Sequence, residues 1–518
     1  MAELAHTPVL IAGGGVTGLS AALFLSWFGV PSSLVERHAE PQAQPKARSV
    51  NARTMELYRA IGLEEVIRSV RSPIAEHTVI AHAETLAGPE LKRLPDRVLG
   101  DDPRLSPCAP ALIDQNQLEP LLREHAAATA ADVRFHTEVV GVVPRASDVL
   151  VTLLDRATGR RWQVCADHLV VADGAHSSIR RMLGIGSGGA GVLARKLNVF
   201  FDADLREHLG GRKIVALTVH NPAVHGFFTP VDGVKRWRFA ISLEPDQRAA
   251  DFTEGRCVKL LRAAIGVEDL PVVVDQVWDS VWEVAGRVTD RMRVGRVYVA
   301  GDAAHTLPPV GSFGIASGVQ DVFNLAWKID LHHRGLAGDG LLASYESERL
   351  PVARETTALT TERYRLLNGA PGDPRTGAEK QSRLVFGYNY RSGAFRRDDA
   401  VADGVEDPHH PAIAPGTRAA YAPLADGRST VDLLGGWALL TGQADAAWQR
   451  AAAGADIPVT AHRLAEPEAY RVPEGGAVLV RPDGFVAWRA TAAEADGLGE
   501  VLDQVLFRRP GSAPPVVT

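Results

Sequence analysis

A glycine-rich loop close to the start of the chain constrains the fold more than any other feature. The segment Gly13-Gly14-Gly15-Val16-Thr17-Gly18 follows an apolar run at residues 9–12 and opens a helix-like stretch. A second strand-like run ends at Glu36, whose carboxylate can accept hydrogen bonds from a ribose. Strand, glycine loop, helix and strand form the βαβ unit that binds dinucleotides. The sequence therefore predicts a parallel sheet with a dinucleotide at this loop.

The glycines of the loop have separate physical tasks. Gly13 makes the tight turn, Gly15 lets the backbone approach a pyrophosphate, and Gly18 lets the helix pack close to the strand. The helix begins at Val16 and Thr17, where free N–H groups and the positive end of the helix dipole face the phosphates. A loop of this kind can serve packing alone, but its place between a strand and a helix favours binding.

A second segment, far downstream, indicates which dinucleotide is bound. An apolar run at residues 297–300 leads into Gly301-Asp302, and Pro308-Pro309-Val310-Gly311-Ser312-Phe313-Gly314 opens another helix. Asp302 would lie at the carboxyl edge of the sheet, where its oxygens can accept hydrogen bonds from polyol hydroxyls. The helix would stabilise negative charge on a reduced ring. Together these features favour FAD, although an Asp after a strand is often a helix cap and such a loop can be a plain connection.

Composition bounds the remaining classes. The 518 residues are too many for one hydrophobic core, so we expect two or three domains. A net charge of −6 with interspersed signs gives no support for nucleic-acid binding. Cys108, Cys165 and Cys257 match no metal or CxxC spacing, which favours inert thiols in a reducing cytoplasm and no metal site. The apolar run at 19–30 is too short to span a bilayer, so we expect no membrane segment.

The pattern along the chain predicts an α/β protein in four segments. Residues 1–184 form the first part of the dinucleotide-binding domain, and residues 185–290 form an inserted sheet-rich domain with several strand-like runs. Residues 291–395 return to the first domain and add long helices. Residues 396–518 hold a linker rich in Asp, His, Pro and Ala, followed by a small α/β domain.

Several stretches resemble the FAD-dependent aromatic monooxygenases of the p-hydroxybenzoate hydroxylase fold, and within them the aromatic polyketide hydroxylases. The stretches are the glycine loop with Glu36-Arg37; Pro45-Lys46-Ala47-Arg48-Ser49; Val171-Ala172-Asp173-Gly174-Ala175-His176-Ser177-Ser178-Ile179-Arg180; Gly301-Asp302-Ala303-Ala304-His305 through Asn324-Leu325-Ala326-Trp327-Lys328; Gly387-Tyr388-Asn389-Tyr390; and Leu479-Val480-Arg481-Pro482-Asp483-Gly484. The resemblance implies a Rossmann-like FAD-binding domain, an inserted β-sheet substrate domain and a C-terminal thioredoxin-like domain. The last has no CxxC, so thiol redox work is not expected there.

The resemblance also assigns roles to single residues. Arg48 resembles an arginine near the flavin and the pyrophosphate, Gln115 resembles a glutamine that contacts FAD, and Asp302 resembles the aspartate that binds the ribityl chain. Asp173 stands in a motif associated with both FAD and NAD(P)H. The cofactor set implied by motif and resemblance is completed by Glu36, Arg37, Pro309, Gly311, Gly314, Ile315 and Ala316.

One stretch departs from the family pattern. After the prolines the family usually reads Gly-Gly-x-Gly-x-Asn, but here the second glycine is Ser312 and the asparagine is Ala316. Ser312 adds a Cβ where backbone alone usually approaches the ring. The sequence therefore predicts altered flavin placement and leaves the efficiency of NADPH reduction open.

The resemblance implies an FAD- and NAD(P)H-dependent monooxygenase. It would hydroxylate a phenolic or quinonoid substrate of the aromatic polyketide type, using dioxygen, through a flavin C4a-hydroperoxide. The cofactor carries that chemistry, so the protein must exclude water and position the substrate, and no catalytic side chain stands out. Baeyer–Villiger oxidation and epoxidation on the same scaffold remain alternatives, as does a flavin-loaded protein without NAD(P)H turnover. The choice of NADPH or NADH, the substrate and the oligomeric state stay open.

Candidate substrate contacts come from the strand-like runs of the inserted domain. They are His225, Phe227, Phe228 and Trp237, with Tyr388 and Tyr390 as alternatives. Each of these residues can equally be an ordinary core or surface residue.

Overall fold

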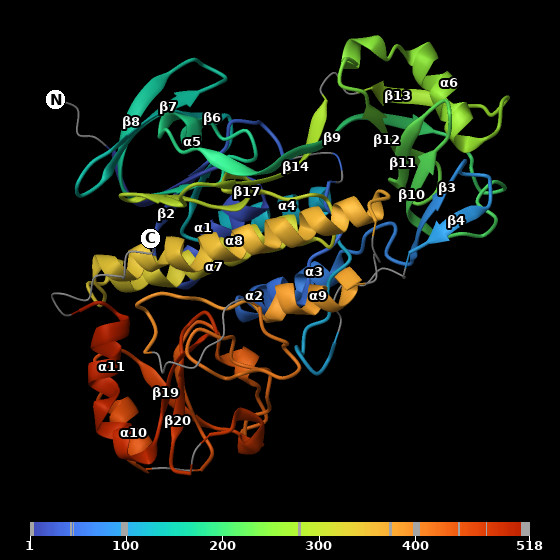
Figure 1. The fold of residues 1–518 in the computed structure, drawn as a ribbon. Coiled ribbons are helices and arrows are strands. Elements are labelled where there is room, and N and C mark those ends of the chain that lie inside the picture. Colours follow the sequence, from blue (N-terminus) through green and yellow to red (C-terminus); the bar gives the residue numbers. More distant parts are fainter. Residues whose placement is uncertain are drawn as a thin grey trace.

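The computed structural model describes residues 5–41, 44, 46–94, 102–277, 281–371, 376–396, 405–443, 446–472 and 474–508. Its strands form three sheets, and the long helices α7 (Phe313–His333) and α8 (Asp339–Leu367) run between the first two sheets and the third (Figure 1). Pro45 and residues 397–404 of the expected linker lie outside the described residues. Within the described part, no helix combines the length and apolar character that crossing a membrane requires.

The first sheet contains the predicted βαβ unit. Strand β1 (Ala5–Ala12) pairs in parallel with β2 (Ser32–Val35) and with β8 (Arg161–Val171), and helix α1 (Val16–Trp27) connects β1 to β2. The late strand β16 (Val297–Val299) pairs in parallel with β8, so the two distant motifs end at one edge of one sheet. The remaining strands are β5 (Asp132–Arg134), β6 (Thr137–Pro144), β7 (Val149–Asp155) and β15 (Arg293–Val294).

Helices cover this sheet because its central strands are apolar on both faces. Val9, Leu10 and Ile11 of β1 are all almost completely buried, as expected for a strand inside a parallel sheet. Helix α1 packs against α7 and against α4 (Gln115–Ala127). The shorter helices of this region are α2 (Ala52–Ala60), α3 (Glu64–Ser69), α5 (Ser178–Met182) and α9 (Thr376–Phe386).

The middle sheet has the strand order β17-β14-β9-β12-β11-β10-β3-β4, with β13 also paired to β9. Helix α6 (Glu254–Ile265) covers one face, where Leu197, Phe201 and Phe239 belong to a separate apolar core. The strands are β3 (Val79–Ala83), β4 (Glu90–Arg93), β9 (Ser187–Asp202), β10 (Ile214–His220), β11 (His225–Pro230), β12 (Arg236–Leu243), β13 (Val273–Val277), β14 (Trp282–Thr289) and β17 (His305–Thr306).

One part of this sheet differs from the sequence-based division of the chain. The sequence predicts that residues 79–93 belong to the first domain, yet β3 pairs in parallel with β10 and β4 pairs with β3. The pairing joins residues far apart in the chain, which a local pattern of apolar residues cannot reveal. The middle sheet is therefore assembled from separate stretches of the chain.

The C-terminal sheet has the order β19-β18-β20-β21, with β18 (Trp437–Thr441) parallel to β19 (Val459–Arg463) and antiparallel to β20 (Ala477–Val480). Helix α10 (Ala446–Ala453) connects the parallel pair, and α11 (Leu498–Val505) follows β21 (Val486–Ala490). A βαβ unit followed by a hairpin and a helix is the arrangement of a thioredoxin-like domain, as expected.

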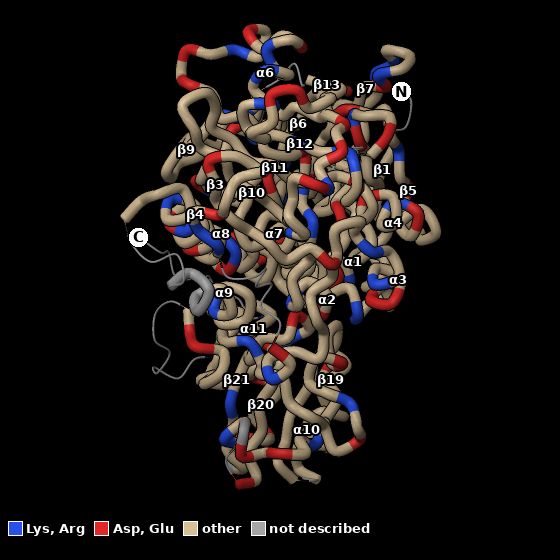
Figure 2. Tube along the Cα trace, turned by 90° about the vertical axis from the view of Figure 1, so that its right-hand side faces the viewer, with Lys and Arg blue, Asp and Glu red and all other residues tan. Residues whose placement is uncertain are grey.

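Buried charges join this third unit to the long helices. Glu348 on α8 accepts from Lys328 Nζ of α7 at 2.7 Å and from two nitrogens of Arg481 at 2.8 Å, and these side chains are fully buried. Asn324 Nδ2 of α7 donates to Asp483 Oδ2 at 3.1 Å. Removing one member of such a buried cluster costs about 3–5 kcal/mol, because its partner then stays buried without compensation. Basic and acidic residues are interspersed over the rest of the molecule (Figure 2).

Candidate flavin and substrate site

Backbone packs closely at two glycines of the loop. Gly13 has a φ of 116°, and a Cβ there would lie 2.2 Å from the carbonyl oxygen of Ala172. A Cβ on Gly18 would lie 1.9 Å from the carbonyl oxygen of Gly13. Any side chain at either position would separate α1 from β1 and β8. Val16 and Thr17 stand at the first turn of α1, as the sequence predicts.

Glu36 supports the same loop from the end of β2. Its Oε2 accepts from the backbone N–H of Gly14 at 2.7 Å, and its Oε1 accepts from the backbone N–H of His38 at 2.8 Å. Arg37 follows as a half-buried residue. The carboxylate therefore fixes the loop in addition to the ribose contact that the sequence predicts for it.

The space over Gly15 is bordered by polar side chains. A Cβ on Gly15 would meet Glu119 Oε1 alone, at an ordinary 3.7 Å. Gln115 Nε2 donates to the same Glu119 oxygen at 2.7 Å, and the backbone N–H of Gln115 donates to the Ala47 carbonyl at 2.8 Å. The geometry thus puts Gln115 beside the point where Gly15 leaves room for a phosphate.

Arg48 connects the first sheet region to the middle sheet. It forms a two-point ion pair with Asp114, at 3.1 Å from Nε and 2.7 Å from Nη2. It also donates to the carbonyl of Val231 at 3.2 Å and to the carbonyl of Pro230, at the end of β11. Arg48 therefore fixes the end of β11 against the start of α4.

Two carboxylates stand at the same edge of the first sheet, after β8 and β16. Asp302 is exposed, yet the protein atoms around it raise its pKa by desolvation, while His305 and Lys46 act in the opposite direction. The Asp302 carboxylate is therefore reached by solvent although many protein atoms surround it, so it lies in a recess. Asp173 Oδ1 is buried without a hydrogen-bond partner. Free acceptors beside a glycine loop suit the hydroxyl groups and phosphates of FAD, so the residues present fit this cofactor.

The loop before α7 has an unusual backbone. Gly311 and Ser312 both have positive φ, 74° and 59°, and Ser312 Oγ is hydrogen-bonded to Ser49 Oγ. A Cβ on Gly314 would meet nothing within 4 Å, so the first turn of α7 borders open space. Pro309 is exposed, Ile315 is half-buried and Ala316 is buried. The free N–H groups of α7 consequently face an accessible region.

Asp321, on α7, holds the Gly301–His305 segment in place. Its Oδ2 accepts from the Gly301 N–H at 3.0 Å and lies 2.8 Å from His305 Nε2, while its Oδ1 accepts from Arg349 Nε at 2.7 Å. Burial raises the pKa of Asp321, but Arg349 and His305 outweigh burial and leave that pKa below its ordinary value. Arg349 Nη1 also donates to the hydroxyl of Tyr390 at 3.1 Å. The carboxylate therefore stays ionised and positions the segment that carries Asp302.

The middle sheet divides the predicted substrate residues between its two faces. Phe228 and Trp237 are buried in the apolar core under α6, on the face of the sheet away from Lys196 and Phe227. His225 and Phe227 alternate with Phe228 along β11 and therefore lie on the opposite face. Tyr388 and Tyr390 lie elsewhere. They are buried in a cluster with Phe485 of the C-terminal unit, and the rings of Tyr390 and Phe485 stack at 4.1 Å.

The face that carries Phe227 holds polar residues that sequence reasoning missed. Lys196 Nζ and the Arg238 guanidinium lie 5.2 Å and 5.7 Å from the centroid of the Phe227 ring. Trp282 Nε1 donates to Asn198 Oδ1 at 3.1 Å on the same face. A charged residue next to an apolar strand would have marked this face in the sequence, since Lys196 directly precedes the buried run 197–201.

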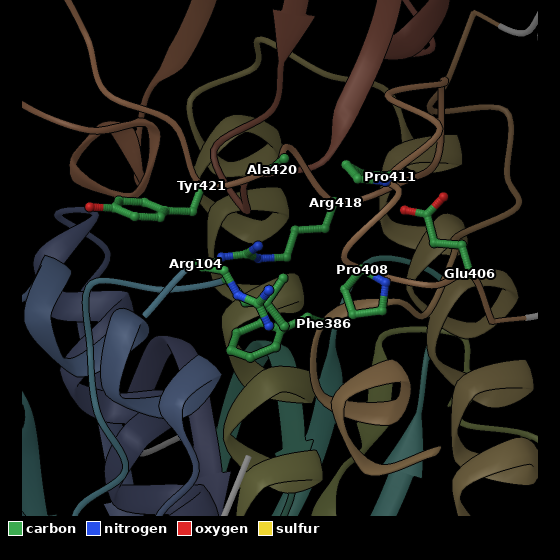
Figure 3. Close-up of a pocket in the computed structure, with 9 residues that line it drawn as sticks. Arg104, Phe386, Glu406, Pro408, Pro411, Arg418, Ala420 and Tyr421 are labelled. Carbon is green, nitrogen blue, oxygen red and sulfur yellow. The ribbon is translucent and has the colours of Figure 1, made fainter. Parts of the chain in front are cut away.

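A separate small cavity lies where the 405–421 segment meets α9. Figure 3 shows Arg104 and Arg418 meeting at Phe386, and the Arg418 guanidinium lies 4.8 Å from the ring centroid. The cavity volume is about 20 Å³, which is room for about one water molecule. It is too small for a flavin or an aromatic substrate.

Comparison with known proteins agrees with this geometry. Residues 6–360 match the model of an FAD binding domain, and residues 412–509 match that of the C-terminal domain of aromatic-ring hydroxylases. A putative polyketide hydroxylase of Streptomyces halstedii is 38% identical over 94% of this chain and 93% of its own length. The tetracenomycin B2 monooxygenase-dioxygenase of Streptomyces olivaceus is 39% identical over 97% of this chain and 98% of its own length.

A solved structure gives the same result for the whole fold. The structure of aklavinone-11 hydroxylase with FAD and aklavinone superposes with a TM-score of 0.88 at 33% identity, covering 98% of this chain and 99% of that one. The chain therefore belongs to the FAD-binding family of aromatic-ring hydroxylases and is an FAD-dependent monooxygenase.

Proposed function

We propose that this enzyme hydroxylates a phenolic or quinonoid compound of the aromatic polyketide type, with NADPH or NADH as the reductant. The overall reaction consumes substrate, dioxygen, the reduced nicotinamide and a proton, and it yields hydroxylated product, oxidised nicotinamide and water. One atom of dioxygen enters the product and the other leaves as water. The observation that carries the substrate class is the face of the middle sheet with Phe227, Trp282, Lys196 and Arg238, which offers aromatic surfaces flanked by cations.

The protein's own part in this reaction is to bind the cofactor, orient the substrate and exclude water. Bound FAD supplies the electron transfer and oxygen activation that side chains lack. The glycine loop and the first turn of α1 would hold the phosphates, and Asp302 would hold the polyol chain. The start of α7 stabilises negative charge in the region it borders. Arg48 fixes the end of β11, so the substrate face keeps its position relative to the cofactor region.

The relatives supply support for the substrate class. The solved structure of aklavinone-11 hydroxylase holds FAD together with aklavinone, and a relative from Streptomyces olivaceus is named for tetracenomycin B2. We extend this class of compound to the present chain as part of the proposal. We also propose that the enzyme acts in the cytoplasm, where reduced nicotinamides are available. We propose domain boundaries near residues 184, 290 and 395, with residues 79–93 assigned to the middle sheet.

The test has an anaerobic and an aerobic step. Under nitrogen, NADPH should bleach the flavin absorbance of the holoenzyme, and a polycyclic phenol should accelerate the bleaching. After air is admitted, mass spectrometry should find a product heavier by one oxygen atom, and NMR should place that atom as a hydroxyl group on an intact ring. A ring-expanded lactone or an epoxide would indicate the alternative oxygen chemistries. A flavin that stays oxidised with every aromatic compound would favour a protein without NAD(P)H turnover. The departures from the family pattern at Ser312 and Ala316 are the reason to consider this alternative.

A further inference from the structure

Lys196 is a buried cation, and none of the acids that the structure describes is paired with it. Its residue is 3% exposed, and its Nζ donates one hydrogen bond, to Ser242 Oγ at 2.7 Å. Across the described ranges, no carboxylate lies within 4.0 Å of this nitrogen. Burial lowers the pKa of Lys196 to about 8. An ammonium group has three donors, and a buried charge without a partner is costly.

The register of the strands defines what surrounds this cation. Ser242 of β12 and Trp282 of β14 stand directly opposite Lys196, so their side chains share its face of the sheet. Phe227 lies one strand further along this face, and the ammonium group stands 5.2 Å from the centre of its ring. An aromatic ring that packs on Phe227 would therefore come within reach of Nζ.

Among the other titratable groups of this face, Arg238 adds positive charge next to Phe227. Arg238 approaches the same ring from β12 at 5.7 Å, and three histidines follow on neighbouring strands. Burial, together with Lys196, His220 and His82, lowers the pKa of His225 to about 4, so that this histidine is neutral near pH 7. Asp202 also belongs to this face, but it is exposed at the end of β9 and stands opposite Arg236. Asp114, which attracts Arg238, is itself paired with Arg48.

We infer that Lys196 is the group that selects the substrate by charge: it holds an ionised oxygen of a flat aromatic ligand, a phenolate or the enolate of a hydroxyquinone, that stacks on Phe227. The inference rests on the proposed function, since it takes this face as the substrate site. One donor of Nζ stays on Ser242, and the others point a charge-assisted hydrogen bond at the ligand oxygen. The ligand thereby supplies a negative charge that the described residues do not place beside Nζ.

The test uses alizarin, a dihydroxyanthraquinone whose absorbance shifts to the red when it ionises, and the oxidised holoenzyme without nicotinamide. At a pH about one unit below the pKa of free alizarin, the bound dye should show the spectrum of its anion. Lys196→Met keeps the length of the side chain and removes the charge. It should weaken alizarin binding at least about tenfold and return the bound dye to its neutral spectrum. Lys196→Arg should keep the anion spectrum.

The matched control is Lys213→Met, in the same domain, because Lys213 is exposed and already paired with Glu76 Oε2 at 2.9 Å. This variant should bind alizarin as the wild type does. A second readout excludes a merely structural role: Lys196→Met should melt no lower than the wild type, because it removes a buried charge that no described carboxylate balances. Alizarin dimethyl ether, which cannot ionise, should bind both proteins equally.

Two results overturn the inference. One is a Lys196→Met variant that binds alizarin with wild-type affinity and spectrum. The other is a wild-type holoenzyme that binds alizarin in its neutral form or fails to bind it. Neither result depends on turnover, so a failure of the proposed hydroxylation would be seen separately, in the NADPH and product measurements.

Discussion

Ser312 and Ser49 are joined through their hydroxyl groups, and Ser312 holds a left-handed backbone with a φ of 59°. The bond ties the residue before α7 to the residue after Arg48, whose side chain reaches the end of β11. Residues 48 and 49 therefore connect the start of α7 to the end of β11 on the middle sheet. A left-handed conformation costs a residue other than glycine about 1–2 kcal/mol.

Replacing Ser312 with Gly should change cofactor behaviour more than stability. The variant loses the bond to Ser49, worth about 1 kcal/mol, but it also loses the backbone strain, so the melting temperature should shift little. The freed loop should raise the rate of flavin reduction by NADPH several-fold, measured by stopped-flow absorbance. Ser49→Ala is the control, because it removes the bond and leaves the φ of Ser312 unchanged. Equal reduction rates in wild type and Ser312→Gly would make this departure from the family pattern neutral.

Asp302→Ala should weaken FAD binding. The carboxylate is accessible and stands beside the glycine loop, where a polyol chain would otherwise be left without an acceptor. Hydrogen bonds to a charged group contribute about 1.5–3 kcal/mol, so the FAD dissociation constant should rise roughly tenfold to a hundredfold. Flavin fluorescence quenching on titration of the apoprotein measures this constant. A variant that purifies fully loaded and binds FAD with unchanged affinity would remove Asp302 from the site.

Asp321→Asn should weaken the contacts that hold the Gly301–His305 segment against α7. Arg349 would remain buried with a neutral neighbour, and the free energy of unfolding should fall by about 3–5 kcal/mol. Because the pKa of Asp321 is depressed in the folded state, its stabilisation is fully present above the unfolded pKa and is lost as the pH falls through the folded one. Acid denaturation of the wild type below about pH 4 should therefore be less steep in the variant. Identical acid profiles would contradict this role.

Lys196 also makes the folded state more stable as the pH rises, but it does so because its charged form is destabilising. Its pKa in the folded protein is about 8, below that of a lysine in an unfolded chain, so the folded state is penalised at lower pH and the penalty fades as the pH rises through this window. The stability gained by Lys196→Met should therefore be largest near neutral pH and should vanish as the pH rises toward about 10. Affinity for an anionic dye should fall in the wild type as the pH rises past about 8. Denaturant unfolding at several pH values checks the first statement and dye titration the second.

The parts of the site that are local in sequence could be predicted, and the parts that depend on distant pairing could not. The glycine loop, Glu36 and Asp302 follow strands and open helices, so their positions were readable from short motifs. Neighbouring residues on a strand point to opposite faces, so Trp237 and Arg238 of β12 lie on different faces of the sheet. Telling which of them faces the substrate requires knowing which face of β12 packs against α6.

The contacts of Asp321 and Tyr390 show the same limit. Arg349 joins them, yet the three residues come from α7, α8 and the segment after α9. Each reads as an ordinary helical or loop residue until the helices are packed together. The sequence makes Tyr390 a candidate substrate contact, but the structure places its hydroxyl against Arg349 and its ring against Phe485 of the C-terminal unit.

The most direct test of the account follows one oxygen atom. The holoenzyme, NADPH and a hydroxyanthraquinone-type substrate are incubated under isotopically labelled dioxygen, and the label is counted in the product together with the NADPH consumed. We predict one labelled oxygen atom in each product molecule, on an aromatic or quinonoid ring, for each NADPH oxidised. NADPH consumption that yields hydrogen peroxide alone, or a product whose new oxygen comes from water, would contradict the assignment.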